Sequence, residues 1–191
     1  MWINALAFII QTLLGLLSLA FLLRFYMQAT NAPFKNSFGQ TIVSLTNFAV
    51  VPTRKIIPAA FRLDSSTLVL AFLTQLILII SLKWLADFPF LVAGQAVWSG
   101  LVGLSALAII KLSIDIFLYA VIAQAILSWV NPHTAISPIL GALTYPLLSR
   151  IHRWLPQPNG LDLSPIIVLV GAKLIDILLI APIESSLLRL F

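Results

Sequence analysis

Three long, mostly apolar runs limit this chain to folds that a lipid bilayer can hold. A membrane-spanning helix needs about 20 mostly apolar residues, and the runs at residues 3–26, 67–85 and 166–183 meet this length. Inside lipid every backbone polar group must find a partner within the spanning structure, which favours helices. The sequence therefore predicts an all-α, multi-pass integral membrane protein. The first run carries no basic residue before Arg24, unlike a cleaved signal peptide, so we expect it to be a retained helix.

Composition and charge point to the same class. The chain is 61% hydrophobic and 9% charged, whereas a soluble domain carries about 25% charged residues. The net charge is +5, but the basic stripe that nucleic acid requires is missing. The excess suits the anionic surface of a membrane, so we expect lipids as partners and no nucleic acid. The chain has no cysteine, which excludes disulfides and thiolate metal sites.

Residues 88–130 form an apolar stretch that is too long for one span. Lys111 and Asp115 are its only charged residues. At 1.5 Å per residue, one helix over the whole stretch would be about 65 Å long, about twice the thickness of the hydrocarbon core. We therefore expect a break at Gly94, Gly100 or Gly103.

An internal repeat suggests where the spans lie. Shifting the chain by 98 residues superposes Leu45, Thr46, Pro58, Leu63, Asp64 and Ser66 on Leu143, Thr144, Pro156, Leu161, Asp162 and Ser164. With two further residues of gap, Gln11 meets Lys111. We therefore predict two tandem helical-hairpin repeats, residues 1–86 and 107–191, joined by residues 87–106. Each repeat contains a span, a loop of about 35 residues and a second span.

The charges of the two loops predict the orientation of the hairpins. Residues 30–66 carry Lys35, Arg54, Lys55 and Arg62, and residues 131–164 carry Arg150 and Arg153. Because Lys and Arg bias loops toward the cytoplasm, both loops are expected inside. The hairpins then run parallel, residues 87–106 form a re-entrant or interfacial segment, and four spans place both termini outside. The alternative is a fifth span at residues 88–109, which would invert the second half.

Both loops contain stretches that suit the bilayer surface. Residues 37–50 and 137–148 alternate apolar and small polar residues and lead into the runs TRKIIP and SRIHRWLP. Amphipathic helices of this kind lie at the interface, with Arg or Lys near phosphates and Trp at headgroup depth. We expect these residues to contact lipid or a partner: Arg54, Lys55, Arg150, Arg153 and Trp154. The alternative is a loop helix packed inside the protein.

A repeated Asp-x-Ser motif stands where the second span of each half begins. It comprises Asp64 and Ser66 in the first half, and Asp162, Ser164 and Pro165 in the second. Asp and Ser cap helix starts, and Pro fits the first helical position. We expect capping together with an ion pair to a nearby Arg or Lys. The alternative is an ion or partner site.

Charged residues also occur inside the predicted spans. Lys111, Asp115, Lys173 and Asp176 can form an intramembrane charge network. Each costs about 2.5–3.5 kcal/mol at the bilayer centre on insertion scales, so a functional role is the default hypothesis. The alternative is a network that fixes helix register. Arg24, Lys83 and Arg189 are interpreted as end anchors.

Signals of catalysis are sparse. His133 and His152 lack partners at metal-ligand spacing, and neither a glycine-rich phosphate loop nor a Gly-x-Ser-x-Gly elbow occurs. We expect neither an enzyme nor a cofactor.

The chain resembles the YggT family of small bacterial membrane proteins, which has YlmG-type relatives in plastids. The second half carries the resemblance in ILSWVNPHTAISPILGALTYPLLSRIHRWLP from Ile126 and GLDLSPIIVL from Gly160. The first half is a degenerate copy, with TNFAVVPTRKIIP from Thr46 and LDSSTLVL from Leu63. The resemblance implies tandem paired spans, no known catalysis, and associations with osmotic tolerance, potassium uptake, division and plastid cytochrome assembly. It also implies a multi-pass protein of the bacterial inner membrane, so that the termini expected outside would be periplasmic.

Two functions follow as expectations. The first is a non-enzymatic inner-membrane scaffold or assembly factor that uses its basic loops to contact lipid, a membrane-protein partner or a second copy. The alternative is an ion-conducting or transport-related protein, tied to potassium uptake, that uses Asp115, Lys173 and Asp176.

Overall fold

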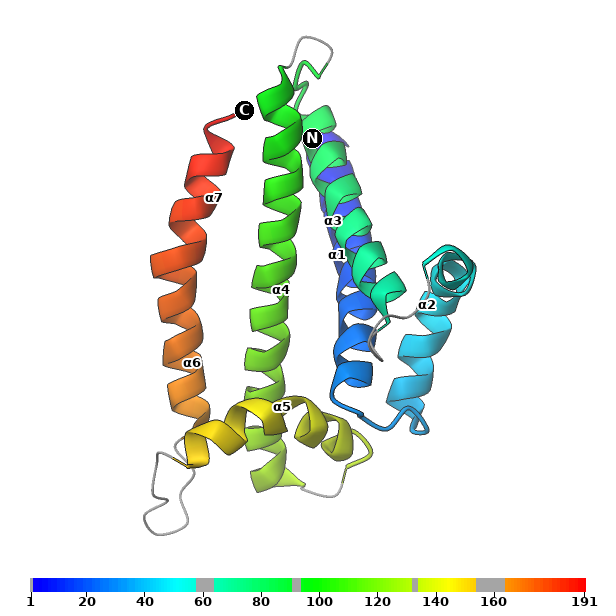
Figure 1. Cartoon of the computed structure of the whole chain (residues 1–191), viewed down its shortest axis with the longest axis vertical. Coiled ribbons are helices and arrows are strands. Elements are labelled where there is room, and N and C mark those ends of the chain that lie inside the picture. The colour runs from blue at the N-terminus through cyan, green and yellow to red at the C-terminus, as the bar shows by residue number, and fades with distance from the viewer. Residues whose placement is uncertain (1, 58–63, 91–93, 132–133, 154–163) are drawn as a thin grey trace.

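The computed structural model describes residues 2–57, 64–90, 94–131, 134–153 and 164–191, and every regular element within these ranges is helical (Figure 1). The elements are α1 (Trp2–Ala29), α2 (Ser37–Ile56), α3 (Ser65–Leu85), α4 (Gln95–Val130), α5 (Ser137–His152), α6 (Ser164–Ile175), the π-helical segment η2 (Asp176–Ile180) and α7 (Ala181–Leu188). The predicted all-α class is confirmed.

Four helices in the described part of the chain are long and apolar enough to span a membrane. They are α1, α3, α4 and the continuous rod α6–η2–α7, which covers Ser164–Leu188. Figure 1 shows both chain ends at one end of the molecule, with α2 and α5 toward the other. The predicted set of four apolar helices is confirmed, and it fits a membrane protein.

Helix α4 is continuous, so the breaks predicted at Gly100 and Gly103 are wrong. Its 36 residues make it about 54 Å long, and only Gly94, at the N-cap, marks an end. Exposed Trp98 and Trp129 stand about 46 Å apart along it. That distance matches the bilayer with its headgroup layers, about 40–45 Å, where tryptophan gathers. The helix is therefore long enough to reach through both interfaces of a bilayer.

The two glycines inside α4 allow close packing of the C-terminal residues. A Cβ at Gly100 would lie 3.1 Å from Leu190 Cδ1, and one at Gly103 would lie 3.1 Å from Leu187 Cδ2. Residues 95–106 thus belong to α4 and do not form a separate re-entrant or interfacial segment. The alternative of a separate fifth span at residues 88–109 is also wrong, because residues 95–109 continue into the same helix.

The two loop regions meet at the end of the bundle that lies away from the termini. Asn36 caps the start of α2 by accepting a hydrogen bond from the Gly39 N–H, and its side-chain Nδ2 donates to the carbonyl oxygen of Ala135 at 2.8 Å. A buried cluster of Met27, Ala32, Ala120, Ile139, Leu140 and Leu143 joins α1 and α4 to α5. Helix α5 lies across the end of α4 (Figure 1). Both basic loops therefore occupy the same end of the molecule.

Candidate functional site

A network of charged side chains lies near the middle of α4. Lys111 Nζ is 3.5 Å from Glu184 Oε2 and 3.9 Å from Asp176 Oδ1, and Lys173 Nζ is 3.9 Å from Asp176 Oδ2. Asp115 lines the same narrow cavity of about 10 Å³, together with Lys111, Lys173 and Asp176. A cavity of that size holds about one water molecule. The structure thus brings together all four residues of the predicted network.

Glu184 belongs to this network and is absent from the sequence prediction. The predicted fourth span ends at Ile183, one residue before Glu184, whereas the helical rod continues to Leu188. A signal was present, because an acidic residue follows the apolar run directly and Pro182 stands two positions before it. Proline is a common cause of irregular turns within helices.

The π-helical segment η2 explains how one helix presents two carboxylates to Lys111. Asp176 and Glu184 are eight positions apart, which in a regular α-helix places them about 80° apart around the axis. A π turn accommodates one extra residue, so the interval acts as about seven α positions, or two turns. Both carboxylates therefore point to the same face, and Lys111 lies between them.

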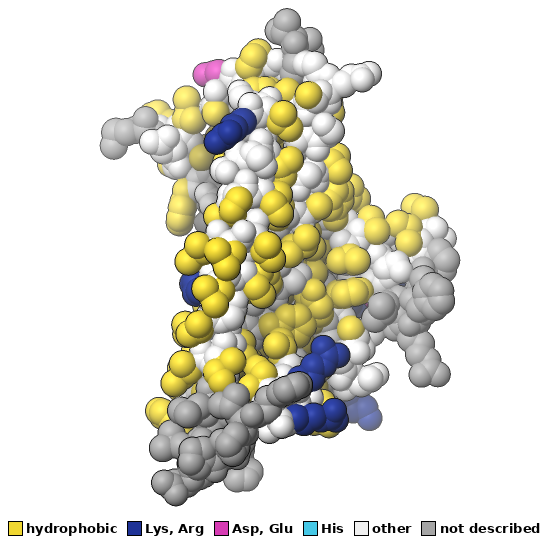
Figure 2. Space-filling model, turned by 60° about the vertical axis from the view of Figure 1, so that its left-hand side comes forward, with side chains coloured by type: hydrophobic (Ala, Val, Ile, Leu, Met, Phe, Trp, Pro, Cys, Tyr) yellow, Lys and Arg dark blue, Asp and Glu magenta, His cyan; other side chains and the backbone are white. Residues whose placement is uncertain are grey.

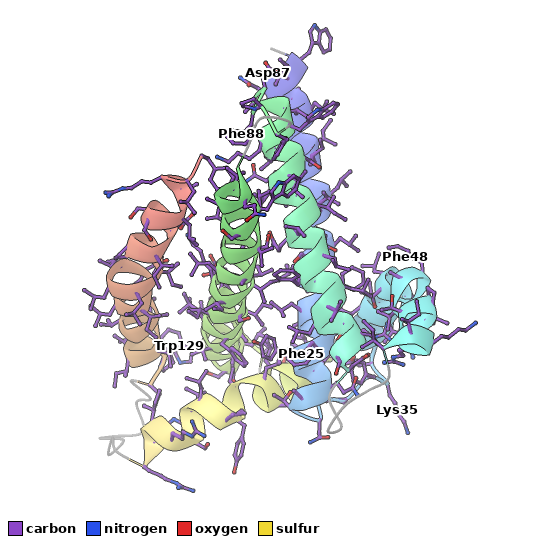
Figure 3. All side chains as sticks on the ribbon, turned by 45° about the horizontal axis from the view of Figure 1, so that its top comes forward. Phe25, Lys35, Phe48, Asp87, Phe88 and Trp129 are labelled. Carbon is purple, nitrogen blue, oxygen red and sulfur yellow. The ribbon has the colours of Figure 1, made fainter. Side chains whose placement is uncertain are left out.

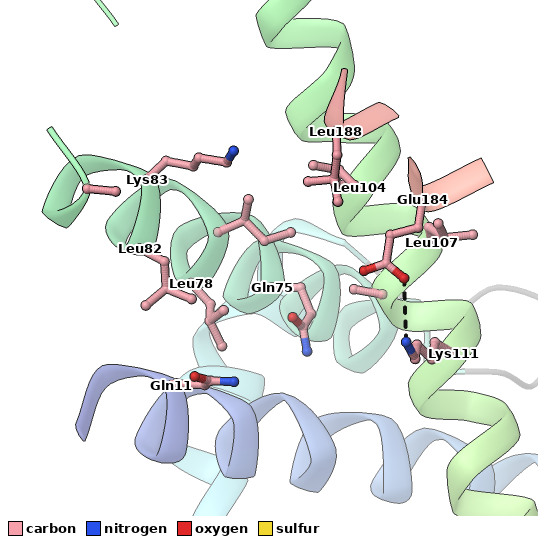
Figure 4. A pocket seen from close by; sticks show the side chains of 13 residues that line it. Gln11, Gln75, Leu78, Leu82, Lys83, Leu104, Leu107, Lys111, Glu184 and Leu188 are labelled. Atoms are coloured by element: carbon pink, nitrogen blue, oxygen red, sulfur yellow. Dashed lines mark hydrogen bonds and ion pairs between the residues drawn. The ribbon is translucent and has the colours of Figure 1, made fainter. Parts of the chain in front are cut away.

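A groove of about 540 Å³ opens beside the network, and we call it the lateral groove. Its walls come from α1, α3, α4 and α7 (Figure 4). Its lining consists of Gln11, Gln75, Leu78, Ile79, Leu82, Lys83, Ala86, Leu104, Leu107, Ala108, Lys111, Glu184 and Leu188. Gln11 and Gln75 face each other across it, and the Lys111–Glu184 pair lies at one side (Figure 4). Lys83 lies at its outer end, 4.1 Å from the centre of the Phe191 ring.

Arg24 forms a second polar centre, and its interpretation as an end anchor is wrong. Its side chain is only 6% exposed. The guanidinium donates to Thr46 Oγ1 at 2.6 Å and to Asn47 Oδ1 at 2.9 Å. Helix α2 folds back over the end of α1 and turns these two polar residues inward, so the guanidinium is held inside the protein.

The equivalent pair in the second half has a different chemistry. Thr144 in α5 is fully buried, and its hydroxyl contacts Gln124 Oε1 in α4. Under the alignment that superposes the two halves, Thr144 corresponds to Thr46 and Gln124 to Arg24. A neutral amide therefore occupies the position that holds a buried cation in the first half.

The Asp-x-Ser motif of the first half has a structural role other than side-chain capping. Asp64 stands at the N-cap of α3, but its carboxylate makes no capping hydrogen bond. It is fully buried and pairs with Arg54, whose Nε lies 3.1 Å from Oδ2, while Oδ1 has no hydrogen-bond partner. The Ser66 hydroxyl donates to the Ile57 carbonyl at 2.8 Å. Arg54 is therefore the ion-pair partner of buried Asp64.

The remaining predicted site residues are found at the same end of the molecule or outside the described residues. Lys55, Arg150 and Arg153 are exposed. Ser164 begins α6 and is 1% exposed, with Pro165 as the next residue. Trp154 and Asp162 lie outside the described residues. Within the described ranges, no group of three or more His, Asp or Glu side chains is placed to hold a metal ion.

Comparison with known proteins places the chain in a family. A sequence model described as CCB3/YggT matches residues 3–85 and 104–183. Uncharacterized protein PA0392 of Pseudomonas aeruginosa is 37% identical over 181 residues, covering 93% of this chain and 89% of the relative. An uncharacterized Vibrio alginolyticus protein encoded in the proC 3' region is 33% identical over 186 residues, covering 92% and 94%.

YggT of Escherichia coli strain K12 is 31% identical over 170 residues, covering 87% of this chain and 85% of the relative. No solved structure matches the chain. The family matches cover most of both halves and include Arg24, Lys111, Asp115, Lys173 and Asp176, whereas Glu184 lies one residue beyond the second match. The chain therefore belongs to the CCB3/YggT family, as the motifs in its second half predict.

Proposed function

We propose that this protein is a non-enzymatic scaffold or assembly factor of the bacterial inner membrane. In this proposal, the end formed by α2 and α5 faces the cytoplasm and binds anionic lipid headgroups or a partner, and both termini are periplasmic. The observation that carries the proposal is the exposed surface of these two helices. Figure 2 shows Lys and Arg side chains gathered near one end of the molecule, next to a broad apolar surface.

Helix α2 exposes large apolar residues on one side and buries the other. The exposed residues are Leu45, Phe48, Val51 and Ile56, and Lys55 lies next to the last of them. Phe48 is 68% exposed on the outer side of α2, and Lys35 extends away from the start of that helix (Figure 3). Apolar side chains beside basic ones suit a helix at the lipid interface.

Helix α5 offers the same combination. Tyr145 is 72% exposed, and Arg150 and Arg153 are exposed at the end of the helix. Each basic residue near an anionic leaflet contributes about 1 kcal/mol of attraction. Two separate family matches, one over each half of the chain, support the proposal that α2 and α5 belong to equivalent repeats.

The test compares charge removal at the two ends of the molecule. We expect Arg150→Gln/Arg153→Gln to weaken binding of phosphatidylglycerol about 30-fold, because two contributions of about 1 kcal/mol are lost. Binding is measured by native mass spectrometry of the detergent-solubilised protein. Lys83→Gln/Arg189→Gln at the opposite end is the charge-matched control. Arg54 stays unchanged, because it pairs with buried Asp64. Equal lipid binding by both double variants would refute the proposal.

A second candidate function is ion transport, and a row of cavities favours it. The lateral groove and the narrow charged cavity share Lys111, and a third cavity of about 370 Å³ shares Ile114, Leu118 and Ala172 with the narrow one. Intramembrane charges at a constriction between cavities are typical of ion pathways. Protein reconstituted in liposomes should then show a cation flux that Asp115→Asn or Asp176→Asn alters. Absence of flux for potassium, sodium and protons removes this candidate.

A further inference from the structure

We propose that the lateral groove docks a membrane-spanning helix of a partner protein, and that this helix presents an Arg or Lys side chain to Glu184. The proposal rests on the assembly role proposed above, because it gives the scaffold a binding site inside the membrane. It differs from the contacts proposed for α2 and α5, which lie at the membrane surface.

The Lys111–Glu184 pair lies at the middle of the long helix α4. Trp98 and Trp129 mark the two interfaces along α4, and Lys111 lies between them, thirteen residues from Trp98. That is about 20 Å from one interface and about 27 Å from the other. The Lys111–Glu184 pair therefore lies near the bilayer centre, where a charge is costly to leave in lipid.

The charged side chains of this pair are partly exposed in the isolated chain. The side chains of Lys111 and Glu184 are 45% and 41% exposed. Acyl chains offer neither a hydrogen-bond donor nor a charge, so lipid covers such a surface only at a large desolvation cost. Gln11 and Gln75 add two amides to the same groove. The groove therefore requires a polar occupant.

The charges at mid-depth do not balance, and the charge that is missing is positive. At mid-depth the network contains the ammonium groups of Lys111 and Lys173 and the carboxylates of Asp115, Asp176 and Glu184, so one negative charge is left over there. Lys83, the other charged residue of the groove lining, lies at its outer end, where its Nζ is 4.1 Å from the centre of the Phe191 ring. Lys111 is shared between Glu184 and Asp176, which leaves Glu184 incompletely neutralised. A basic side chain entering the groove would pair with Glu184 and release Lys111 to Asp176.

The shape of the groove suits a helix. Helices α3 and α7 flank α4, and their backbones are not adjacent to each other. The floor between them comes from α4 at Leu104, Leu107, Ala108 and Lys111, which have the spacing of one helix face. Ridges of one helix pack into such a groove, and polar contacts strengthen packing inside lipid. A second copy fits less well, because its own mid-depth lysines already pair with its own carboxylates.

The test uses synthetic poly-leucine membrane-spanning peptides with a single central Arg, Leu or Glu. Protein and peptide are reconstituted together in phosphatidylcholine liposomes, and association is measured by energy transfer between fluorophores. We expect the Arg peptide to bind about tenfold more tightly than the Glu peptide, within the range of polar contacts between membrane helices. Glu184→Gln should reduce the Arg peptide to the affinity of the Leu peptide.

A second pair of variants tests whether the peptide binds in the groove itself. Ala108→Trp fills the floor of the groove without changing a charge and should exclude the Arg peptide. Ile177→Trp, on the exposed side of the rod, is the matched control and should leave binding intact. Equal binding of the Arg and Glu peptides, or of the Ala108→Trp and Ile177→Trp variants, would overturn the proposal. Energy transfer between copies of the protein that Ala108→Trp abolishes would also overturn it, since a second copy would then occupy the groove.

The same assay distinguishes this proposal from the surface role. The Arg150→Gln/Arg153→Gln variant should bind the Arg peptide like the wild type, because these residues lie at the end of α5 outside the groove. Loss of lipid binding in that variant with retained peptide binding supports both proposals. Normal lipid binding with retained peptide binding removes only the surface role.

Discussion

Replacing Arg24 by methionine removes the cation that ties α2 to the bundle. Two short hydrogen bonds are lost, to Thr46 Oγ1 at 2.6 Å and to Asn47 Oδ1 at 2.9 Å, together with a longer one to the Val43 carbonyl at 3.4 Å. A hydrogen bond to a charged group contributes about 1.5–3 kcal/mol. Thr46 keeps its own hydrogen bond to the Ile42 carbonyl, and half-buried Asn47 can be rehydrated. We therefore expect the free energy of unfolding to fall by about 3 kcal/mol, near the lower end of the two-bond range.

Arg24→Gln is the informative companion variant. The second half of the chain already places Gln124 against buried Thr144, so a glutamine at position 24 should keep one neutral hydrogen bond to Thr46. We expect it to cost about 1.5 kcal/mol, half the cost of methionine, because the charged bonds are lost and one neutral bond remains.

Reversible unfolding in mixed micelles with increasing dodecyl sulfate, followed by far-ultraviolet circular dichroism, gives the free energy of each variant. Hydrogen exchange over residues 37–56 shows whether α2 detaches first, as expected if Arg24 holds it. The reasoning fails if Arg24→Met lies within about 0.5 kcal/mol of the wild type, the range of an ordinary surface substitution. It also fails if glutamine is as damaging as methionine.

Two further predictions use the same unfolding assay. Arg54→Gln should cost about 2 kcal/mol, less than the loss of a fully buried pair because Arg54 is 44% exposed, and Arg54→Gln/Asp64→Asn should recover most of this loss by removing the buried charge. No recovery in the double variant would contradict the pairing. Gly103→Leu should destabilise by about 1–3 kcal/mol, because a Cβ there already lies 3.1 Å from a neighbouring side chain. Gly15→Ala, with open space around its Cβ, should stabilise by up to about 1 kcal/mol, and a destabilised Gly15→Ala would argue against the helix packing.

The ends of the spanning helices were largely predictable, because bilayer thickness determines the length of an apolar run. Residues 3–26 and 67–85 correspond to α1 at Trp2–Ala29 and α3 at Ser65–Leu85. The error in α4 arose from limiting a helix to the thickness of the hydrocarbon core and from placing the resulting break at a glycine. In α4, Gly100 and Gly103 lie inside the helix and allow the C-terminal residues to approach closely.

The candidate site was only partly predictable from the sequence. Lys111 and Asp176 attract attention because charges stand out in apolar runs. Glu184 was missed because its inclusion depends on a π turn that realigns it with Asp176. Arg24 was missed because only the folding of α2 over the end of α1 buries it. These two residues depend on tertiary contacts, which hydropathy does not encode.

The central claim is that both basic loops face one side of the membrane and the α3–α4 connection faces the other. The chain has no cysteine, so single reporters can replace Lys35, Ala135 and Gln95, all of which are exposed. A membrane-impermeant maleimide applied to intact spheroplasts should label Gln95→Cys, and should label Lys35→Cys and Ala135→Cys only after permeabilisation. Labelling of the Lys35 and Ala135 reporters from opposite sides would contradict the account, because the neighbouring Asn36 side chain is hydrogen-bonded to Ala135.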